Sequence, residues 1–110
     1  MNAVLVVLTN LPDRASAEAL AVRLVEGRHA ACVNILAPCV SVYRWKNDIQ
    51  HDEEHPLLIK TTAEHYAALE NAIRDAHPYD LPEIIALPVS AGLPAYLDWV
   101  AQETSAGASA

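Results

Sequence analysis

The chain has 110 residues, of which 53% are apolar and 19% are charged, and its formal net charge is −7. This length and composition predict one folded domain with a hydrophobic core and argue against disorder. Fourteen acidic residues against seven basic ones repel phosphate backbones, so we expect no nucleic-acid partner.

The longest apolar runs, such as residues 3–8, are far shorter than the roughly 20 residues that a membrane-spanning helix needs. No basic segment precedes a signal-like apolar core. Cys32 and Cys39 lie in a region that we predict to be extended, which separates them by about 23 Å, too far for a disulfide. Free thiols suit a reducing compartment, and we predict a soluble cytoplasmic protein with no membrane association.

Residues 1–9 form a near-continuous aliphatic run, which predicts a buried strand. A turn follows, and its Asp13 is placed to cap a helix. Apolar residues then recur with helical spacing at Ala17, Leu20, Ala21, Leu24 and Val25, with Gly27 just beyond them.

Residues 29–45 are rich in Val, Ile and Ala without a helical stripe, so we expect one long strand that bends at Pro38. A turn at residues 46–48 and a returning arm at 49–62 complete a hairpin. Arms of this length reach about 43 Å, whereas a helix of about 14 residues covers only about 21 Å. Uncovered apolar strands pair with other chains, so we predict a closed oligomer built through the hairpin, with a solvated β-arm as the alternative.

The second half of the chain repeats the helix-then-strand order. Thr61 and Glu64 match a capping box, and a second helical stripe ends before Pro78. Residues 83–89 read as a short buried strand. Pro94 opens a last helix, and the side chains that we expect it to bury are Tyr96, Leu97, Trp99 and Val100.

The resulting order, β-α-β-β-α-β with a terminal helix, predicts an α+β fold of the ferredoxin-like sandwich type with a long hairpin. We assign residues 1–101 to this single domain. Residues 102–110 are small and polar, so we expect a flexible tail.

Several kinds of enzyme are excluded by missing residues. With three glycines, the chain has neither a Walker loop nor a dinucleotide-binding fingerprint. It also lacks a G-x-S-x-G setting, and neither cysteine has a basic neighbour in sequence. Arg14 follows the first strand as in an acylphosphatase, but Pro12 removes a phosphate-binding amide there. We therefore expect no catalytic activity.

Two segments carry possible metal ligands. In an extended strand, His51, Glu53 and His55 share one face and could bind a divalent cation weakly, or they could form a solvated, charged sheet edge. The loop of residues 77–83 brings an imidazole and carboxylates together between two prolines, which suits Cu(II) or Zn(II). Alternatively, His77 closes a helix C-terminus and Glu83 accepts loop hydrogen bonds.

Six segments in this order resemble the CutA family, the divalent-cation tolerance proteins. The resemblance extends from about Ala3 to Val100. It rests on Thr9-Asn10-Leu11-Pro12-Asp13, Ala30-Ala31-Cys32-Val33-Asn34, Val42-Tyr43-Arg44-Trp45, Ile59-Lys60-Thr61-Thr62, His77-Pro78-Tyr79-Asp80-Leu81-Pro82-Glu83 and Tyr96-Leu97-Asp98-Trp99.

The resemblance implies a ferredoxin-like protomer in a homotrimer whose long strands pair between subunits. It also implies a link to copper and other divalent metal ions. The trimer is similar to that of the PII signalling proteins, which is an analogy of fold alone.

The family resemblance assigns copper binding to a cysteine at the end of the first strand, to the histidine of the H-P-Y motif and to a following glutamate. Here the last two are His77 and Glu83, while Thr9 stands at the cysteine position. A hydroxyl is a poor substitute for a thiolate, so any site should prefer Cu(II) or Zn(II), bound weakly. Cys32 belongs to the family's A-A-C-V strand as a core thiol, and Cys39 has no assigned role.

Two functional hypotheses follow. The first is a trimeric protein that binds copper or another divalent metal ion and takes part in the response to metal ions. The second is a PII-like signalling or scaffolding trimer that binds a small anionic ligand or a protein partner between subunits. Lys60, which closes an apolar strand, favours the second if it meets an anion in the inter-subunit cleft.

Overall fold

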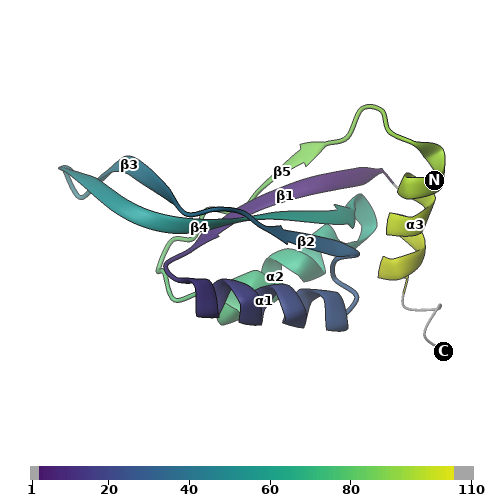
Figure 1. The fold of residues 1–110 in the computed structure, drawn as a ribbon, viewed down its shortest axis with the longest axis horizontal. Helices are drawn as coiled ribbons and strands as arrows, with labels where there is room; N and C mark the ends of the chain where they lie inside the picture. The colour runs from purple at the N-terminus through teal and green to yellow at the C-terminus, as the bar shows by residue number, and fades with distance from the viewer. Residues whose placement is uncertain (1–2, 106–110) are drawn as a thin grey trace.

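The computed structural model describes residues 3–105 and consists of one antiparallel sheet with three α-helices (Figure 1). This arrangement confirms the predicted α+β class. The elements in chain order are β1 (Val4–Leu11), α1 (Arg14–Glu26), β2 (Cys32–Ile35), β3 (Cys39–Trp45), β4 (Asp48–Thr62), the short 3₁₀ helix η1 (Ala63–His65), α2 (Tyr66–Ala76), β5 (Ile85–Pro88) and α3 (Pro94–Thr104).

The sheet has the strand order β2-β4-β1-β5, and β3 pairs with the first half of β4. In its second half, β4 lies between β1 and β2, with Val7 opposite Ile59 and Val33 opposite the same residue from the other side. Helices α1 and α2 cover one face of the sheet, and the β3–β4 hairpin projects beyond them (Figure 1). The predicted excess of hairpin length over helix length is therefore confirmed.

The hairpin turn is a tight two-residue connection. Lys46 and Asn47 have φ angles of 50° and 73°, and they join the paired residues Trp45 and Asp48. Two consecutive positive φ angles define a type I′ turn, whose twist matches that of the flanking strands. The predicted turn at residues 46–48 is confirmed.

The prediction of one bent strand over residues 29–45 is wrong. The structure divides this segment into β2 and β3, which are separated by residues 36–38. The Leu36 amide still donates to the Pro56 carbonyl at 2.9 Å, but Pro38 has no amide with which to continue the ladder. The pairing resumes at Cys39, opposite Glu54.

Helix α1 begins and ends close to the predicted residues. The Asp13 carboxylate accepts a hydrogen bond from the Ser16 amide at 2.8 Å, which confirms the predicted cap. At the other end, the Gly27 amide donates to the Arg23 carbonyl at 3.0 Å. The left-handed residue that turns the chain is Arg28, with a φ of 59°, and not the glycine.

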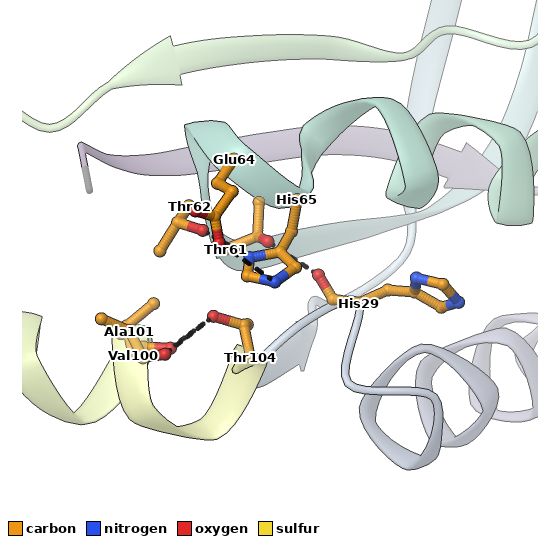
Figure 2. Close-up of polar contacts among 8 residues, drawn as sticks. All are labelled: His29, Thr61, Thr62, Glu64, His65, Val100, Ala101 and Thr104. Carbon is orange, nitrogen blue, oxygen red and sulfur yellow. Dashed lines mark hydrogen bonds and ion pairs between the residues drawn. The ribbon is translucent and has the colours of Figure 1, made fainter. Parts of the chain in front are cut away.

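The predicted capping box at Thr61 is wrong. Thr61 is a fully buried residue of β4, and its hydroxyl donates to the His29 carbonyl at 2.7 Å (Figure 2). Thr62 precedes η1, and its hydroxyl makes no capping bond to that helix but lies 2.7 Å from His65 Nδ1. Thr61 cannot cap because its strand position points it into the interior between sheet and helices.

The main core lies between the sheet and the two helices that cover it. Strand residues Val7, Leu57 and Ile59 are completely buried, as are Leu24 of α1 and Ile73 of α2. Alternation along the strands leaves apolar residues on the opposite face, which α1 and α2 do not cover. These residues include Val6 and Leu8 of β1, Leu58 of β4, and Ile85 and Leu87 of β5.

Helix α3 packs against one end of the sheet through Val100, which forms a second buried cluster with Val4 and Ala31. Burial is confirmed for Val100, but Tyr96 and Trp99 are 40% and 39% exposed, so the prediction that they are buried is wrong for the protomer.

The prediction of a flexible tail over residues 102–110 is wrong for its first three residues. Helix α3 continues to Thr104, whose buried hydroxyl donates to the Val100 carbonyl at 2.9 Å (Figure 2). Residues 102–104 are therefore helical, and residues 106–110 lie outside the described part of the chain. Within residues 3–105, no helix combines the length and the hydropathy needed to span a membrane.

Candidate functional site

A cavity of about 720 Å³ lies between the hairpin and the segment that precedes β5. Residues 41–45 of β3 form one wall together with Asp52 and Glu54 of β4. The segment before β5 forms the other wall, and Asn10 at the end of β1 joins the two. The residues contributed by the second wall are Tyr79, Asp80, Leu81 and Glu83.

Carboxylates dominate the charge of this cavity. Its lining contains Asp52, Glu54, Asp80 and Glu83, against the single guanidinium of Arg44. Acidic walls attract cations and repel anions, the more so where the wall is shielded from water. The charge of the lining is therefore suited to a cationic ligand.

Two tyrosine hydroxyls donate to carboxylates inside the cavity. The Tyr79 hydroxyl donates to Glu54 Oε2 at 3.0 Å, and the Tyr43 hydroxyl donates to Asp52. Burial and the bond to Glu54 raise the pKa of Tyr79 to about 12. The hydrogen bond to Asp52 likewise raises the pKa of Tyr43, so both phenols are neutral donors at physiological pH.

His77 has partners at both ring nitrogens. Nε2 lies 2.6 Å from the Asn10 carbonyl oxygen, which can only accept, and Nδ1 lies 3.2 Å from the Tyr79 amide, which can only donate. These partners require a neutral ring with its proton on Nε2. Burial lowers the pKa of His77, which also favours the neutral form. The imidazole therefore connects β1 to the loop before β5.

Glu83 contacts the same asparagine from another side. Its Oε1 accepts from Asn10 Nδ2 at 3.1 Å, whereas His77 contacts the Asn10 backbone carbonyl. The structure thus brings His77 and Glu83 to a common residue, but not to a common ligand position. Thr9 points to the helix-covered face, where its hydroxyl is buried without a hydrogen-bond partner among the described residues.

These contacts do not fit a metal site built on His77 and Glu83 as they stand. Both imidazole nitrogens are occupied, and Thr9 lies on the other face of β1. Within residues 3–105, no three His, Cys, Asp or Glu side chains are grouped closely enough to hold a metal ion. His77 would have to leave Asn10 or Tyr79 before it could coordinate an ion.

The segment from His51 to His55 is part of β4, as an extended conformation predicts. His51 and Glu53 are exposed, which agrees with a solvated, charged edge. Glu54 and His55 are each only 8% exposed, so that interpretation fails for them. The His55 ring is buried on the helix-covered side, and its Nδ1 has no partner in the part of the chain that the structure describes.

Sequence reasoning missed Glu54 and Asn10 as site residues. The period of two along β4 places Glu54 on one face with Asp52, and that signal was available. No local pattern indicated the opposing wall, because only the fold brings residues 79–83 against the hairpin.

Two other features of the sequence analysis lie outside the cavity lining. Lys60 is on the sheet face that α1 and α2 leave open, where its ammonium group contacts the Asn34 side chain of β2. Cys32 and Cys39 are both free thiols, as predicted, but Cys32 is half-buried and not a core residue.

Comparisons with known proteins agree with this fold. The family model described as CutA1 divalent ion tolerance protein matches residues 5–103. The chain is 43% identical over 99 residues to the Divalent-cation tolerance protein CutA of Thermus thermophilus, covering 90% of this chain and 96% of that one. It is 44% identical over 93 residues to Protein CutA of the mouse. The matched residues make up 84% of this chain and 52% of the mouse protein.

Solved structures give the same result. The structure of the divalent cation tolerance protein from Thermus thermophilus superposes with a TM-score of 0.91 at 42% identity, covering 93% of this chain and 99% of that one. The PII-like protein CutA from Nostoc sp. PCC 7120 superposes with a TM-score of 0.85 at 36% identity, covering 96% of this chain and 98% of that one. Together with the antiparallel sheet, its projecting hairpin and the sequence segments at the cavity, these matches show that the chain belongs to the CutA family of divalent-cation tolerance proteins.

Proposed function

We propose that this chain forms a homotrimeric, non-catalytic protein that binds a cation in the cavity between the hairpin and the loop before β5, and so takes part in the response to metal ions. One observation carries the proposal: four carboxylates and a single guanidinium line the cavity. Such a field concentrates cations at the site.

Divalent metal ions are the first ligands to consider, because the family is named for tolerance to them. Glu83 is exposed in the cavity lining, and a glutamate oxygen can serve as a ligand to a divalent ion such as Zn(II). Thr9 offers no thiolate, which argues against tight Cu(I) binding. In this proposal His77 holds Asn10 and Tyr79 in place, and it becomes a ligand only if those bonds open.

Native mass spectrometry with and without stoichiometric Cu(II) tests the metal proposal, since one spectrum reports both assembly and metal count. We expect a trimer that takes up about one copper ion per chain. Glu83→Ala should weaken uptake, and His77→Ala should weaken it too if His77 either binds the ion or positions the loop. Unchanged affinity in both variants would contradict a site at these residues.

The trimer proposal rests on apolar surface that the protomer leaves uncovered. Leu87 and Ile85 of β5 are 51% and 49% exposed on the open face of the sheet, and Val42 of the hairpin is 61% exposed. Exposed apolar strands of this kind favour pairing with another chain. A partner that covers them would stabilise both the open face and the hairpin.

Leu87→Glu tests this assembly. We expect the variant to lose the trimer while its circular dichroism stays that of a folded protomer, because a charge would be buried at the interface. Val22→Glu is the matched control, since Val22 is 56% exposed on α1, away from the open face. A trimer that survives Leu87→Glu would exclude the open face as the interface.

A second candidate function is a PII-like signalling role without physiological metal binding. The Nostoc relative is described as PII-like, and a cavity of about 720 Å³ lies within the range of small-molecule sites. A thermal-shift screen with nucleotides and organic anions tests this role. Because its lining is acidic, we expect no anion to bind in the cavity. A thermal shift caused by a nucleotide would therefore indicate a nucleotide site elsewhere, for example near Lys60.

We also propose that the protein works in the cytoplasm. The free thiols of Cys32 and Cys39 support a reducing compartment. Fractionation of cells that express the protein, with markers for each compartment, tests this location.

A further inference from the structure

The open face of β4 carries opposite charges in its two halves. Every second residue of the strand points to this face, which α1 and α2 leave uncovered. The first half presents Asp48, Asp52 and Glu54 there, and the second half presents Lys60. Among the strand residues that share this face within residues 3–105, Lys60 is the only basic one.

Lys60 has no anionic partner in its own chain. It is half-buried, and its ammonium group contacts the neutral side chain of Asn34. In the described part of the chain, no carboxylate forms an ion pair with it. A second copy that covers the open face would remove this ammonium group further from water, and buried charges are normally paired. We therefore expect the assembly to bring a carboxylate to Lys60.

Glu54 has the complementary need. It is 8% exposed, and its Oε2 accepts a hydrogen bond from the Tyr79 hydroxyl, which carries no charge. No lysine, arginine or histidine among residues 3–105 forms an ion pair with it. Six residues along one extended strand separate Glu54 from Lys60 by about 20 Å, so the two can meet only between different copies.

The symmetry of a closed trimer allows this meeting. Rotation around a ring joins one patch of each copy to a different patch of the next. If the hairpin of one protomer crosses the second half of β4 in the next, the acidic residues face Lys60, whereas contact between two hairpins would bring like charges together. The hairpin projects beyond the helices, where another chain can reach it (Figure 1).

The surroundings of Glu54 suit a lysine side chain. The rings of Tyr43 and Trp45 line the same cavity as the Glu54 carboxylate. A lysine can place its methylene groups against aromatic rings while its ammonium group reaches a carboxylate. The cavity thus offers contacts for both parts of the side chain.

We propose that Lys60 of each protomer enters the hairpin cavity of the next protomer and forms an ion pair with Glu54 there. The inference rests on the proposed function in one respect, namely that the chain forms a trimer. It names the residue that one copy contributes to the cavity of another. The pair uses the β4 wall, so Asp80 and Glu83 on the opposite wall stay available to the cation of the proposed function.

Subunit exchange between unlabelled and isotope-labelled protein tests the proposal. Native mass spectrometry follows the exchange at a fixed urea concentration below the unfolding transition. Lys60→Met keeps the aliphatic stem and Glu54→Gln keeps the shape, while each removes one charge. Each variant should exchange at least about tenfold faster than the unaltered protein, because the opposite charge is left buried without a partner.

The double variant Lys60→Met/Glu54→Gln tests whether the two side chains contact each other. It should exchange no faster than the faster single variant, because no charge is then left unpaired. Effects that multiply would show that the two residues act at separate places and would overturn the inference. If Glu54→Gln does not fold, Glu54→Asp takes its place in this cycle, with a smaller effect that should also fail to multiply.

Two variants on the helices control for the change of net charge. Arg74 of α2 and Glu26 of α1 are both exposed, and neither belongs to the sheet. Arg74→Met and Glu26→Gln remove the same charges as the test variants, and their exchange rates should stay within about twofold of the unaltered protein.

The outcomes separate this inference from the proposed function. A monomer in the native mass spectrum of the unaltered protein would overturn the trimer and the inference together. A trimer in which Lys60→Met exchanges no faster than Arg74→Met would overturn the inference and leave the trimer in place.

Discussion

The two halves of β4 lie in contrasting surroundings. The second half packs against α1 and α2, where Leu57 and Ile59 are completely buried. The first half pairs with β3 and projects beyond the helices, and Ile49 there is 53% exposed (Figure 1). One continuous strand therefore contributes its second half to the core and its first half to the cavity.

This contrast separates the apolar surface that the protomer buries by itself from the apolar surface that it leaves exposed. The sheet face that α1 and α2 cover has its own core, which needs no other chain to bury it. A hairpin alone is at best marginally stable in water, and here it exposes Val40 and Val42 by 67% and 61%. The hairpin is the region whose stability and chemistry should respond most to assembly.

The strongest loss of stability should come from Ile59→Ala. Deleting a fully buried aliphatic side chain should lower the free energy of unfolding by about 2–5 kcal/mol, because a cavity remains and apolar contacts are lost. Ile49→Ala makes the same change on the same strand and should cost less than about 1 kcal/mol if no partner covers it. Urea denaturation of both variants measures this difference. Equal losses would show that an assembled partner buries the hairpin as fully as the helices bury the core.

The next effect concerns the junction between the two regions. His77→Ala removes the ring that connects the Asn10 carbonyl to the Tyr79 amide, and it should destabilise the protein by about 1–3 kcal/mol, because both partners lose a hydrogen bond in a half-buried place. Denaturant midpoints measure the loss. Glu83→Ala, which removes one exposed contact to Asn10, should cost less. The reverse order would show that Glu83 and not His77 holds the junction.

Local sequence patterns predicted the helix-covered region well. The aliphatic run of β1, the stripe of α1 and the Asp13 cap are each determined by residues close together in the chain. The predictions that failed depend on tertiary contacts. Thr61 looked like a cap from its neighbours, but the pairing of β4 with β1 points it into the interior.

The candidate site was predictable only in part. The loop with His77 and Glu83 was selected from its side-chain chemistry, and both residues do lie where β1 meets the cavity wall. Glu54 was missed because its charged neighbours suggested a solvated strand edge. Its burial arises when residues 79–83 fold against the hairpin, which no local pattern indicates.

A smaller effect, dependent on pH, should appear in the helix-covered region. Hydrogen bonds from Ser16 hold the pKa of Asp13 below its ordinary value of 3.8, so the folded state favours the charged carboxylate. Its contribution to stability is present above pH 3.8 and is lost as the pH falls through the lower pKa of the folded state.

Denaturation of Asp13→Ala and Asp13→Asn across about pH 3 to 7 tests this contribution. The alanine variant should be less stable at neutral pH and should lose less of its stability in acid. The asparagine variant keeps a capping oxygen without a titratable group, so it should retain most of the stability while losing the same part of the pH dependence. An unchanged pH profile in both variants would contradict the role of the Asp13 charge.

The weakest effect should come from the hairpin turn, and it acts on the exposed region alone. Asn47 has a φ of 73°, a conformation that glycine adopts without steric cost and that the type I′ turn requires. Asn47→Gly should therefore raise the free energy of unfolding by up to about 1 kcal/mol, and Asn47→Ala should lower it. Urea midpoints of the two variants measure both changes. If both substitutions are neutral, the hairpin tip is not part of the cooperative unit, and the boundary between the two regions would lie nearer to Glu54, where β4 passes from the exposed half to the buried half.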